Sequence, residues 1–397
     1  MNEPKLRFPE FTDDWKSCKV SEVAEKTFGG GTPKTSNETF WIGDIPWIQS
    51  SDLVDGNLFD INPKKYISQE AINKSAAKLV PENSIAVVTR VGVGKLMFIP
   101  FSYATSQDFL SLSGLKTESQ FTSYSLYKRL QQDLCKVQGT SIKGITKDEL
   151  LVKEIMVPSY EEQKKIGECL HSVDTLIQSA EKELEGYREL KQGMLQKMFP
   201  KKGEKVPEIR FPEFNGDWKL CKLGDIGSVS MCRRIFKEQT TESGDIPFYK
   251  IGTFGGKADA YISKDLFEEY KAKYPFPKIG DILISASGSI GRTVEFNGEN
   301  AYFQDSNIVW LNHDERVDNS FLKQFYSIVK WSGLEGSTIK RLYNDNILKT
   351  EISLPSLDEQ QKIGSYFSNL DNLITSQQQE LDGYKELKKG LLQQMFC

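Results

Sequence analysis

The sequence predicts an α+β protein that is built twice, with two similar mixed α/β domains and a long helix after each of them. Three observations lead to this prediction. The chain has 397 residues, enough for two or three domains of ordinary size. It matches itself over nearly its whole length at an offset of about 200 residues. Each copy ends in a long stretch with a heptad pattern of apolar residues.

The two copies begin in closely similar ways. LRFPEFTDDWKSCKV from Leu6 aligns with IRFPEFNGDWKLCKL from Ile209, and 10 of these 15 positions are identical. GDIPW at Gly43 then matches GDIPF at Gly244. The middles diverge, and from Gly139 onward the copies align again at an offset of 197. Each half therefore has a similar beginning, a dissimilar middle and a similar end.

The middle of each copy is rich in predicted strands. Apolar runs separated by Gly, Asn, Asp and Ser turns are typical of β-strands. Such runs occur at 45–49, 84–91, 95–99 and 109–115 in the first copy, and at 246–252, 281–287 and 307–312 in the second. Short helices are expected near 121–132 and 320–331. The globular part of each copy is therefore mixed α/β.

A long helix is predicted at the end of each copy. Ser159 with Glu162, and Ser356 with Glu359, form capping-box patterns directly after a proline. A seam with alternating spacings of four and three follows in each helix, which is roughly 38 residues long, or ~57 Å. A stripe this narrow favours a partner helix, which the duplicate supplies, over packing on the helix's own domain alone. The predicted seam residues are Ile166, Leu170, Val173, Ile177, Ala180, Leu184, Tyr187, Lys191, Met194 and Met198, then Ile363, Phe367, Leu370, Ile374, Gln377, Leu381, Tyr384, Lys388, Leu391 and Met395.

These elements divide the chain into four segments. We expect domains at 1–158 and 201–355, and long helices at 159–200 and 356–397. The net charge is −4, but the first predicted domain carries 19 basic and 19 acidic residues and the second carries 22 of each. Any binding to DNA must therefore come from local basic clusters rather than from an overall positive field.

The composition excludes several classes of protein. A mean hydropathy of −0.45, the lack of a long apolar run and the lack of a signal-peptide pattern predict a cytoplasmic protein that does not interact with membranes. Six scattered cysteines without a CxxC, and only two histidines, argue against a disulfide framework, a zinc site or a His-based triad. No P-loop, dinucleotide-binding or methyltransferase motif occurs. We therefore expect no catalytic residue, cofactor or metal in this chain.

Seven loop segments combine Gly, Ser or Thr with cationic residues. Backbone amides, hydroxyls and lysines hold phosphates, whereas arginines and amides read base edges. A single such loop also fits an ordinary solvated turn, but seven of them, partly matched between the copies, favour nucleic acid. The candidate DNA-binding residues are Lys34, Thr35, Ser36, Arg90, Lys95, Lys143, Arg233, Arg234, Lys250, Lys257, Ser287, Arg292, Lys340, Arg341 and Tyr343.

The combination of segments resembles the specificity subunit of type I restriction–modification systems. It includes GGTP-type and GDIPW-type segments, a Gly-Ser/Thr-x-Ile-Lys segment, and PxxxEQxxIG at the start of a long helix that ends in LKxGxLQxMF. Both copies carry the PxxxEQxxIG motif, at Pro158, Glu162, Gln163, Ile166 and Gly167 and at Pro355, Glu359, Gln360, Ile363 and Gly364.

The resemblance implies that each variable middle is a target recognition domain that reads one half of a bipartite site in double-stranded DNA. It also implies that the helices pack antiparallel as a spacer and dock two methyltransferase subunits, and that restriction/translocase subunits join for cleavage. S-adenosylmethionine, ATP and Mg²⁺ belong to those partners in the family, so this chain would be non-catalytic. Because the middles differ, the half-sites should differ. The competing interpretation, favoured by the neutral domains, is a non-catalytic scaffold with two protein-binding modules on a coiled coil.

Overall fold

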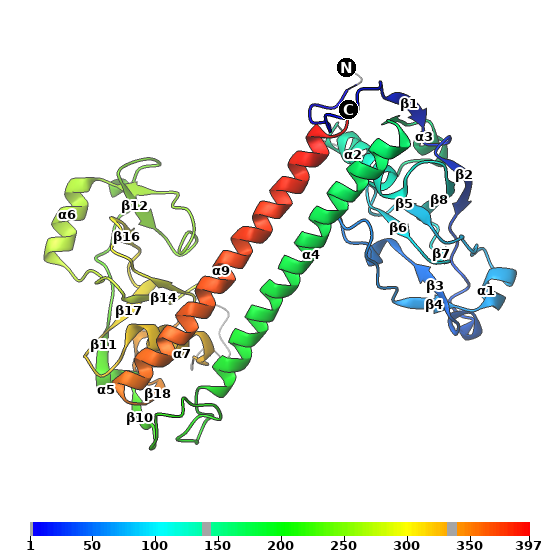
Figure 1. Cartoon of the computed structure of the whole chain (residues 1–397). Coiled ribbons are helices and arrows are strands. Elements are labelled where there is room, and N and C mark those ends of the chain that lie inside the picture. The colour runs from blue at the N-terminus through cyan, green and yellow to red at the C-terminus, as the bar shows by residue number, and fades with distance from the viewer. Residues whose placement is uncertain (1–2, 137–143, 332–339) are drawn as a thin grey trace. The chain divides into compact units, whose positions relative to one another are not determined.

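The computed structural model describes residues 3–136, 144–331 and 340–397. The chain forms two compact units, of which unit 1 contains residues 1–182 and 379–397 and unit 2 contains residues 183–378. The long helices α4 (Tyr160–Lys197) and α9 (Leu357–Gln394) each pass from one unit into the other (Figure 1). Each unit therefore consists of one globular part and a portion of both long helices.

A four-stranded antiparallel sheet forms the centre of each globular part. Its strands, in spatial order, are β2 (Ala24–Gly29), β8 (Phe109–Leu115), β5 (Ser84–Val88) and β6 (Leu96–Ile99) in unit 1, and β11 (Gly227–Ser230), β17 (Ile308–His313), β14 (Ile282–Ser285) and β15 (Thr293–Glu295) in unit 2. The order is the same in both units. The divergent middles of the two copies therefore keep one topology.

Two smaller sheets complete each globular part. The three-stranded sheets are β4 (Lys65–Ile67), β3 (Ile45–Ile48) and β7 (Ala104–Thr105) in unit 1, and β13 (Tyr261–Ile262), β12 (Ile246–Tyr249) and β16 (Tyr302–Phe303) in unit 2. The two-stranded sheets are β1 (Lys16–Lys19) with β9 (Glu154–Val157), and β10 (Lys219–Lys222) with β18 (Glu351–Leu354). In these two-stranded sheets, the similar beginning of each copy pairs antiparallel with its similar end.

Short helices connect the strands. They are α1 (Gln69–Lys74), α2 (Ser119–Lys136) and α3 (Lys147–Leu151) in unit 1, and α5 (Leu223–Ile226), α6 (Lys264–Lys273), α7 (Asn319–Ile328) and α8 (Asn344–Leu348) in unit 2. Single 3₁₀ turns lie at Glu38–Trp41, Ser50–Asp52 and Lys237–Gln239. The two helices predicted within the globular parts are α2 and α7, and α7 ends three residues before the predicted position.

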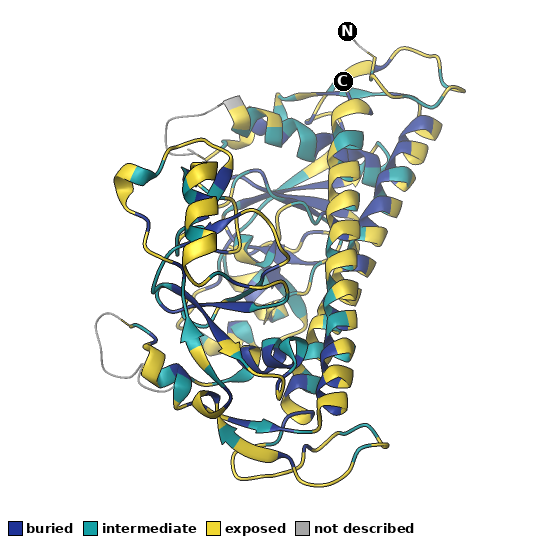
Figure 2. Ribbon diagram, turned by 90° about the vertical axis from the view of Figure 1, so that its left-hand side faces the viewer, coloured by how far each residue is buried: buried dark blue, intermediate teal, exposed yellow. Residues whose placement is uncertain are grey.

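The predicted long helices and their seam are confirmed. None of the twenty predicted seam residues is exposed, and buried and exposed positions alternate along both helices (Figure 2). In unit 1, Asp174 pairs with Lys388 and Glu181 pairs with Lys385, at N–O distances of 2.5 and 2.8 Å. The corresponding contacts of unit 2, 197 residues away along the chain, follow the same order. The two helices therefore run antiparallel within each unit, as the resemblance implies.

The predicted capping boxes form only in part. Ser159 Oγ accepts a hydrogen bond from the Glu162 backbone at 3.4 Å, and Ser356 does the same for Glu359. The Glu162 carboxylate does not turn back to the helix start, because it accepts two hydrogen bonds from Arg7 at 2.8 and 2.9 Å. Arg210 holds Glu359 in the same way in unit 2. The carboxylates of the motif thus attach the RFPEF segments to the helices.

The glutamine of each PxxxEQxxIG motif attaches a helix of the globular part. Gln163 Oε1 accepts from the Glu118 backbone N–H, just before α2, at 2.9 Å. Gln360 accepts from Asp318, just before α7, at the same distance. The glycine of the motif permits this close approach, since an added Cβ at Gly167 would lie 3.1 Å from the backbone nitrogen of Phe121. The motif therefore fixes each globular part on its long helix.

The Met-Phe pair at the end of each long helix is buried in the core of a unit. Phe199, at the end of α4, packs against Trp218 in unit 2, with ring centroids 6.1 Å apart. Phe396, after α9, packs against Trp15 in unit 1 at 6.4 Å. The helix that starts beside one globular part thus ends in the core of the other unit.

Candidate nucleic-acid interface

Loops from four separate segments meet at one end of the four-stranded sheet of unit 1, where β2 and β5 end and β6 and β8 begin. The Thr32 hydroxyl donates to Gln107 Oε1 at 3.0 Å, which joins the segment after β2 to the turn before β8. The backbone N–H of Thr89 donates to Asp108 O, and that of Ile145 donates to Thr89 O, both at 2.7 Å. We call this end of the sheet the loop edge of unit 1.

Unit 2 has a corresponding loop edge, where β11 and β14 end and β15 and β17 begin. The Ser287 hydroxyl, after β14, donates to Asn307 Oδ1, before β17, at 2.8 Å. The backbone N–H of Leu342 donates to Ala286 O at 2.8 Å. Leu342 lies 197 residues after Ile145, so the matched GTSIK and GSTIK regions lead to equivalent places in the two units.

The predicted residues of unit 1 that the structure describes follow β2 or lie between β5 and β6, which are strands that meet at its loop edge. The exposed ones are Lys34, Thr35, Ser36 and Arg90. Lys95 is half-buried, and its ammonium group donates to the carbonyl of Leu53 at 2.8 Å. The ammonium group of Lys95 is therefore engaged within the fold. Lys143 lies outside the described residues.

The predicted residues of unit 2 come from the segments that follow β11, β12 and β14 and from 340–343. The exposed ones are Arg233, Arg234, Lys257, Arg292, Lys340 and Tyr343. Three others are half-buried and engaged: Lys250 pairs with Asp259 at 2.8 Å, Arg341 donates to the carbonyl of Ser306 at 3.0 Å, and Ser287 holds Asn307. The loop edge of unit 2 thus presents more arginine than that of unit 1.

Two amide side chains at the loop edges did not stand out in the sequence. Gln107 and Asn307 each lie just before the second strand of their four-stranded sheet, β8 and β17. Amides of this kind read adenine in the major groove. They lie in the divergent middles and have no neighbouring cation in sequence. The only signal for them was their place at the start of a predicted strand, with Asn307 as its first residue and Gln107 two residues before it.

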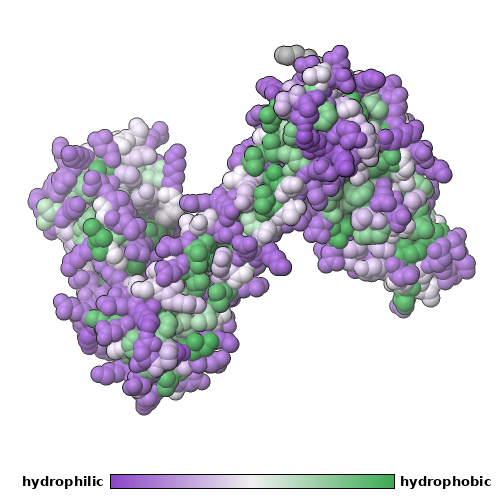
Figure 3. Space-filling view, in the orientation of Figure 1, coloured by the Kyte–Doolittle hydropathy of each residue, from purple (hydrophilic) through white to green (hydrophobic). Residues whose placement is uncertain are grey.

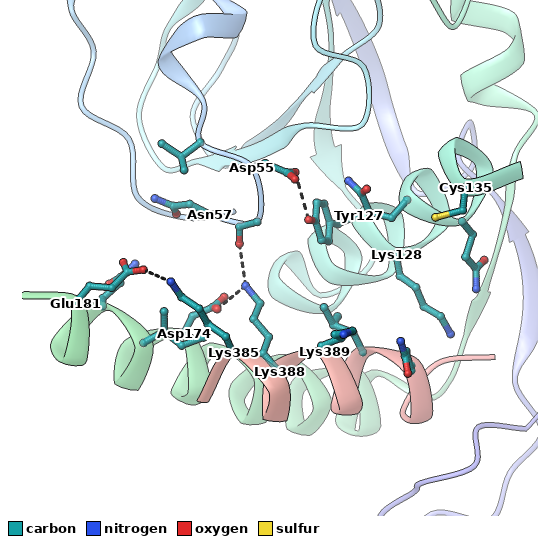
Figure 4. Close-up of a pocket in the computed structure, with 18 residues that line it drawn as sticks. Asp55, Asn57, Tyr127, Lys128, Cys135, Asp174, Glu181, Lys385, Lys388 and Lys389 are labelled. Carbon is teal, nitrogen blue, oxygen red and sulfur yellow. Dashed lines mark hydrogen bonds and ion pairs between the residues drawn. The ribbon is translucent and has the colours of Figure 1, made fainter. Parts of the chain in front are cut away.

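Unit 1 contains a cavity of about 1180 Å³ between the loop 54–57, α2 and the two long helices (Figure 4). Lys388 Nζ binds the Asp174 carboxylate at 2.5 Å and the Gly56 carbonyl at 2.8 Å. The hydroxyl of Tyr127 donates to Asp55 at 3.2 Å, and burial together with this carboxylate raises the pKa of Tyr127, which stays a neutral donor. These contacts hold the loop on the helix pair.

The described residues contain no group of three or more His, Cys, Asp or Glu side chains that could hold a metal ion. Among the same residues, no helix is both long enough and apolar enough to span a bilayer.

The sequence matches the type I restriction modification DNA specificity domain over residues 12–186 and 215–383. It is 25% identical over 414 aligned residues to a type I restriction enzyme specificity subunit of Methanocaldococcus jannaschii, covering 96% of this chain and 92% of the relative. A putative type I restriction enzyme specificity subunit of Haemophilus influenzae is 62% identical over 159 residues, which span 40% of this chain and 41% of that protein.

The fold is also similar to a solved structure. The S subunit of a type I restriction–modification system from M. genitalium aligns with a TM-score of 0.64 over 100% of this chain and 99% of its own, at 16% identity. This likeness extends over both globular parts and both long helices.

Proposed function

The chain belongs to the family of type I restriction–modification DNA specificity subunits, and on this basis we propose that the two loop edges read the two halves of a bipartite DNA site. As a member of this family it is a non-catalytic component of a DNA-binding type I restriction–modification complex and carries two target recognition domains. In this proposal the globular part of unit 1 reads one half-site and that of unit 2 reads the other.

The repeated loop edge is the observation that carries the proposal. Both units present loops at the same end of a sheet with the same strand order. The exposed side chains of the segments that lead away from these edges differ, with Lys34, Thr35 and Ser36 after β2 and Arg233 and Arg234 after β11. An equivalent position with different hydrogen-bonding groups is what two readers of different base sequences require. The two half-sites are therefore expected to differ.

Salt dependence of DNA binding tests this proposal. The chain, assembled with its modification subunits, should bind duplex DNA with an affinity that falls linearly with the logarithm of salt concentration. Lys340→Ala should weaken binding to all sequences evenly and reduce that slope by about one. Lys219→Ala, a lysine on β10 away from the loop edge, is the control and should leave the slope unchanged. Binding without a salt slope would contradict the proposal and favour the protein-binding scaffold.

We propose that two methyltransferase subunits dock on exposed leucines of the long helices. Leu176 and Leu387 are 44% and 47% exposed in unit 1, and Leu190 and Leu373 are 45% and 46% exposed in unit 2. The two pairs are related by the offset of 197 residues. Since the same apolar patch occurs twice, it suits a partner that binds in two copies.

These leucines share one flank of the helix pair. Each of them directly precedes a seam residue on its helix, whereas Glu181 and Lys385 follow seam residues and form their ion pair on the opposite flank. The antiparallel register places Leu176 and Leu387 at nearly the same level. Neither of them lines the cavity between α2 and the helices, which agrees with this placement.

The surroundings of the leucines fit an amphipathic helix with basic residues. Gly186, four residues before Leu190, and Gly383, four before Leu387, would have nothing within 4 Å of an added Cβ. Glycine in a helix costs about 1 kcal/mol relative to alanine, and here it leaves room for a close helix–helix approach. The exposed carboxylates of Glu183 and Glu189 disfavour DNA at this surface and favour a basic partner.

The number of bound modification subunits tests the docking surface. We expect Leu190→Glu with Leu373→Glu to leave one modification subunit bound instead of two, because the patch of unit 1 is intact. Native mass spectrometry of the assembled complex measures this number. Leu220→Glu is the control, since Leu220 is 66% exposed on β10 and should not affect assembly. Two bound subunits in the double variant would contradict the docking surface.

We also propose that the helices determine the separation of the half-sites. One heptad inserted after Ala180 and one after Gln377 keep the seam in phase. Seven residues at 1.5 Å per residue add ~10.5 Å, which corresponds to about three base pairs at ~3.4 Å each. Because three base pairs also rotate the duplex by roughly a third of a turn, activity should fall as the preferred spacing lengthens. Methylation of a library with randomised spacers measures the shift, and an unchanged spacer in an active variant would contradict it.

A further inference from the structure

The segment after β11 is anchored so that two adjacent arginines face outward. Cys232 and Ile235 are buried in the core of unit 2, with 2% and 9% of their surface exposed. Between them, Arg233 and Arg234 are exposed. Burial raises the pKa of the Cys232 thiol to about 12, so this anchor stays neutral and apolar. The backbone is also held directly, because the hydroxyl of Tyr302 donates to the Arg233 carbonyl at 3.0 Å.

Each of the two guanidinium groups lies over an aromatic ring. The Cζ of Arg233 is 5.2 Å from the ring centroid of Tyr274, and that of Arg234 is 5.7 Å from the ring of Phe236. Such cation–π contacts restrict a long side chain before it meets its ligand. Among the described residues, neither guanidinium group donates a hydrogen bond, so their N–H groups are available to a partner. The half-exposed ring of Phe236 lies beside Arg234.

Unit 1 presents different chemistry after its corresponding strand, β2. After β2 the backbone is packed so closely that an added Cβ at Gly30 would lie 1.8 Å from the carbonyl oxygen of Ser106. The side chains that follow are the ammonium group of Lys34 and the hydroxyls of Thr35 and Ser36. Neither group offers the planar pair of donors that a guanidinium offers.

We infer that Arg233 and Arg234 read guanine, so that the half-site bound by unit 2 contains guanine at the positions they face. Guanine presents two acceptors, O6 and N7, on its major-groove edge, and the arginine fork matches both of them. A lysine ammonium group can also donate to these acceptors, but it lacks the rigid planar fork, and a hydroxyl has a single donor. The inference rests on the proposed function and adds the base that one of its two readers selects.

Guanine analogues in the DNA test this inference directly. The complex with its modification subunits is first used to determine the methylated sequence, and Arg233→Lys and Arg234→Lys identify the half-site of unit 2 as the one whose base preference changes. Replacing a guanine of that half-site by 7-deazaguanine removes N7 alone and should weaken binding on the order of tenfold or more. The same replacement in the other half-site should have a smaller effect. In the lysine variants the penalty of the analogue in the unit 2 half-site should be smaller than in the parent, because the ammonium group lacks the planar pair of donors.

Arg316→Lys is the matched control, because this exposed arginine of unit 2 follows the end of β17 opposite to the loop edge and pairs with Asp314. It should keep the parent base preference and the parent penalty for the analogue. A half-site of unit 2 without guanine, or lysine variants that keep the full penalty, would overturn the inference while leaving DNA recognition intact. Loss of sequence-specific methylation in the parent complex would instead contradict the proposed function, and this inference with it.

Discussion

The two units hold the long helices by related ion pairs that differ in burial. Asp174 and Lys388 in unit 1 are 11% and 12% exposed, whereas Asp371 and Lys191 in unit 2 are 30% and 23% exposed. In unit 1, Tyr124 also donates to Asp174 at 2.5 Å, and burial with this carboxylate raises the pKa of the tyrosine well above its usual range. The duplication thus kept one ion pair in both units, and the divergent globular parts changed its surroundings.

The residue that corresponds to Tyr124 in unit 2 shows how this difference arose. Gln163 binds the backbone of Glu118 just before α2, and Gln360 binds that of Asp318 just before α7. Counted from these two equivalent residues, Tyr124 on α2 corresponds to Gln324 on α7. Gln324 is buried, and its amide nitrogen has no hydrogen-bond partner among the described residues. The buried carboxylate of Asp174, which binds both Lys388 and Tyr124, therefore corresponds in unit 2 to a more exposed carboxylate without the tyrosine.

The largest effect in this comparison is expected from the phenylalanines at the helix ends. Phe396→Ala should destabilise unit 1, and Phe199→Ala should destabilise unit 2, each by about 3–5 kcal/mol, because a buried ring is removed from a packed core. Hydrogen exchange of β5 and of β14 measures the two units separately. Phe236→Ala, at a half-exposed ring, is the control with a small effect. If either variant lost hydrogen-exchange protection equally in both units, the two cores would not be separate.

A smaller and unequal effect is expected from the two ion pairs. Asp174→Ala leaves the buried ammonium group of Lys388 without its carboxylate and should cost about 3 kcal/mol. Asp371→Ala breaks a partly exposed pair with Lys191 and should cost about 1 kcal/mol. Chemical denaturation followed by hydrogen exchange in each unit gives both values. Similar costs in the two units would show that Tyr124 and burial add little to the contact in unit 1.

The helix glycines should separate into two classes of opposite sign. Gly167→Ala and Gly364→Ala place a Cβ against α2 and α7 and should cost about 1–3 kcal/mol by overpacking. Gly186→Ala and Gly383→Ala meet nothing within 4 Å and should stabilise the free chain by about 0.5–1 kcal/mol. Thermal unfolding of the free chain measures these changes. If Gly186→Ala and Gly383→Ala bind modification subunits as tightly as the parent, these glycines are not needed for helix docking.

The smallest effect concerns an exposed contact that the two units make with different groups. Glu181 pairs with Lys385 at 2.8 Å, whereas in unit 2 the neutral Gln378 accepts from Arg188 at 3.0 Å. Glu181→Gln should therefore cost at most about 0.5 kcal/mol at low salt and nothing measurable at high salt. Gln378→Glu should give a gain of similar size. Denaturation at two ionic strengths distinguishes this screened pair from a packing effect.

Much of the fold was predictable because its signals are local. The heptad spacing predicted both long helices, and all of the predicted seam residues are at least half-buried. Apolar runs predicted the strands of the four-stranded sheets, except for the short edge strand β15 and the first strands, β2 and β11. Those first strands contain charged, Gly or Ser residues, AEKTFG and GSVS, and form only because a long apolar strand pairs with them.

The sequence predicts the kind of site, which is a set of loops with exposed cations. The role of each single residue is less predictable. Two of the predicted exposed cations, Arg90 and Arg292, lie in the turns between β5 and β6 and between β14 and β15, at the loop edges. Lys95 follows a Gly-rich turn, as a phosphate-binding lysine would, but its ammonium group donates to the carbonyl of Leu53, 42 residues away. No local pattern distinguishes these two uses of a lysine.

The duplication, the long helices and their seam could be predicted without a structure, because repeats and periodicity are patterns along the chain. The partner that each side chain meets depends instead on how the chain folds. Glu162 has the local pattern of a capping box, yet its carboxylate binds Arg7, 155 residues away. Phe199 follows the first globular part in sequence and completes the core of unit 2. In both cases a buried group takes the partner that satisfies it best, and that partner comes near only when the chain folds.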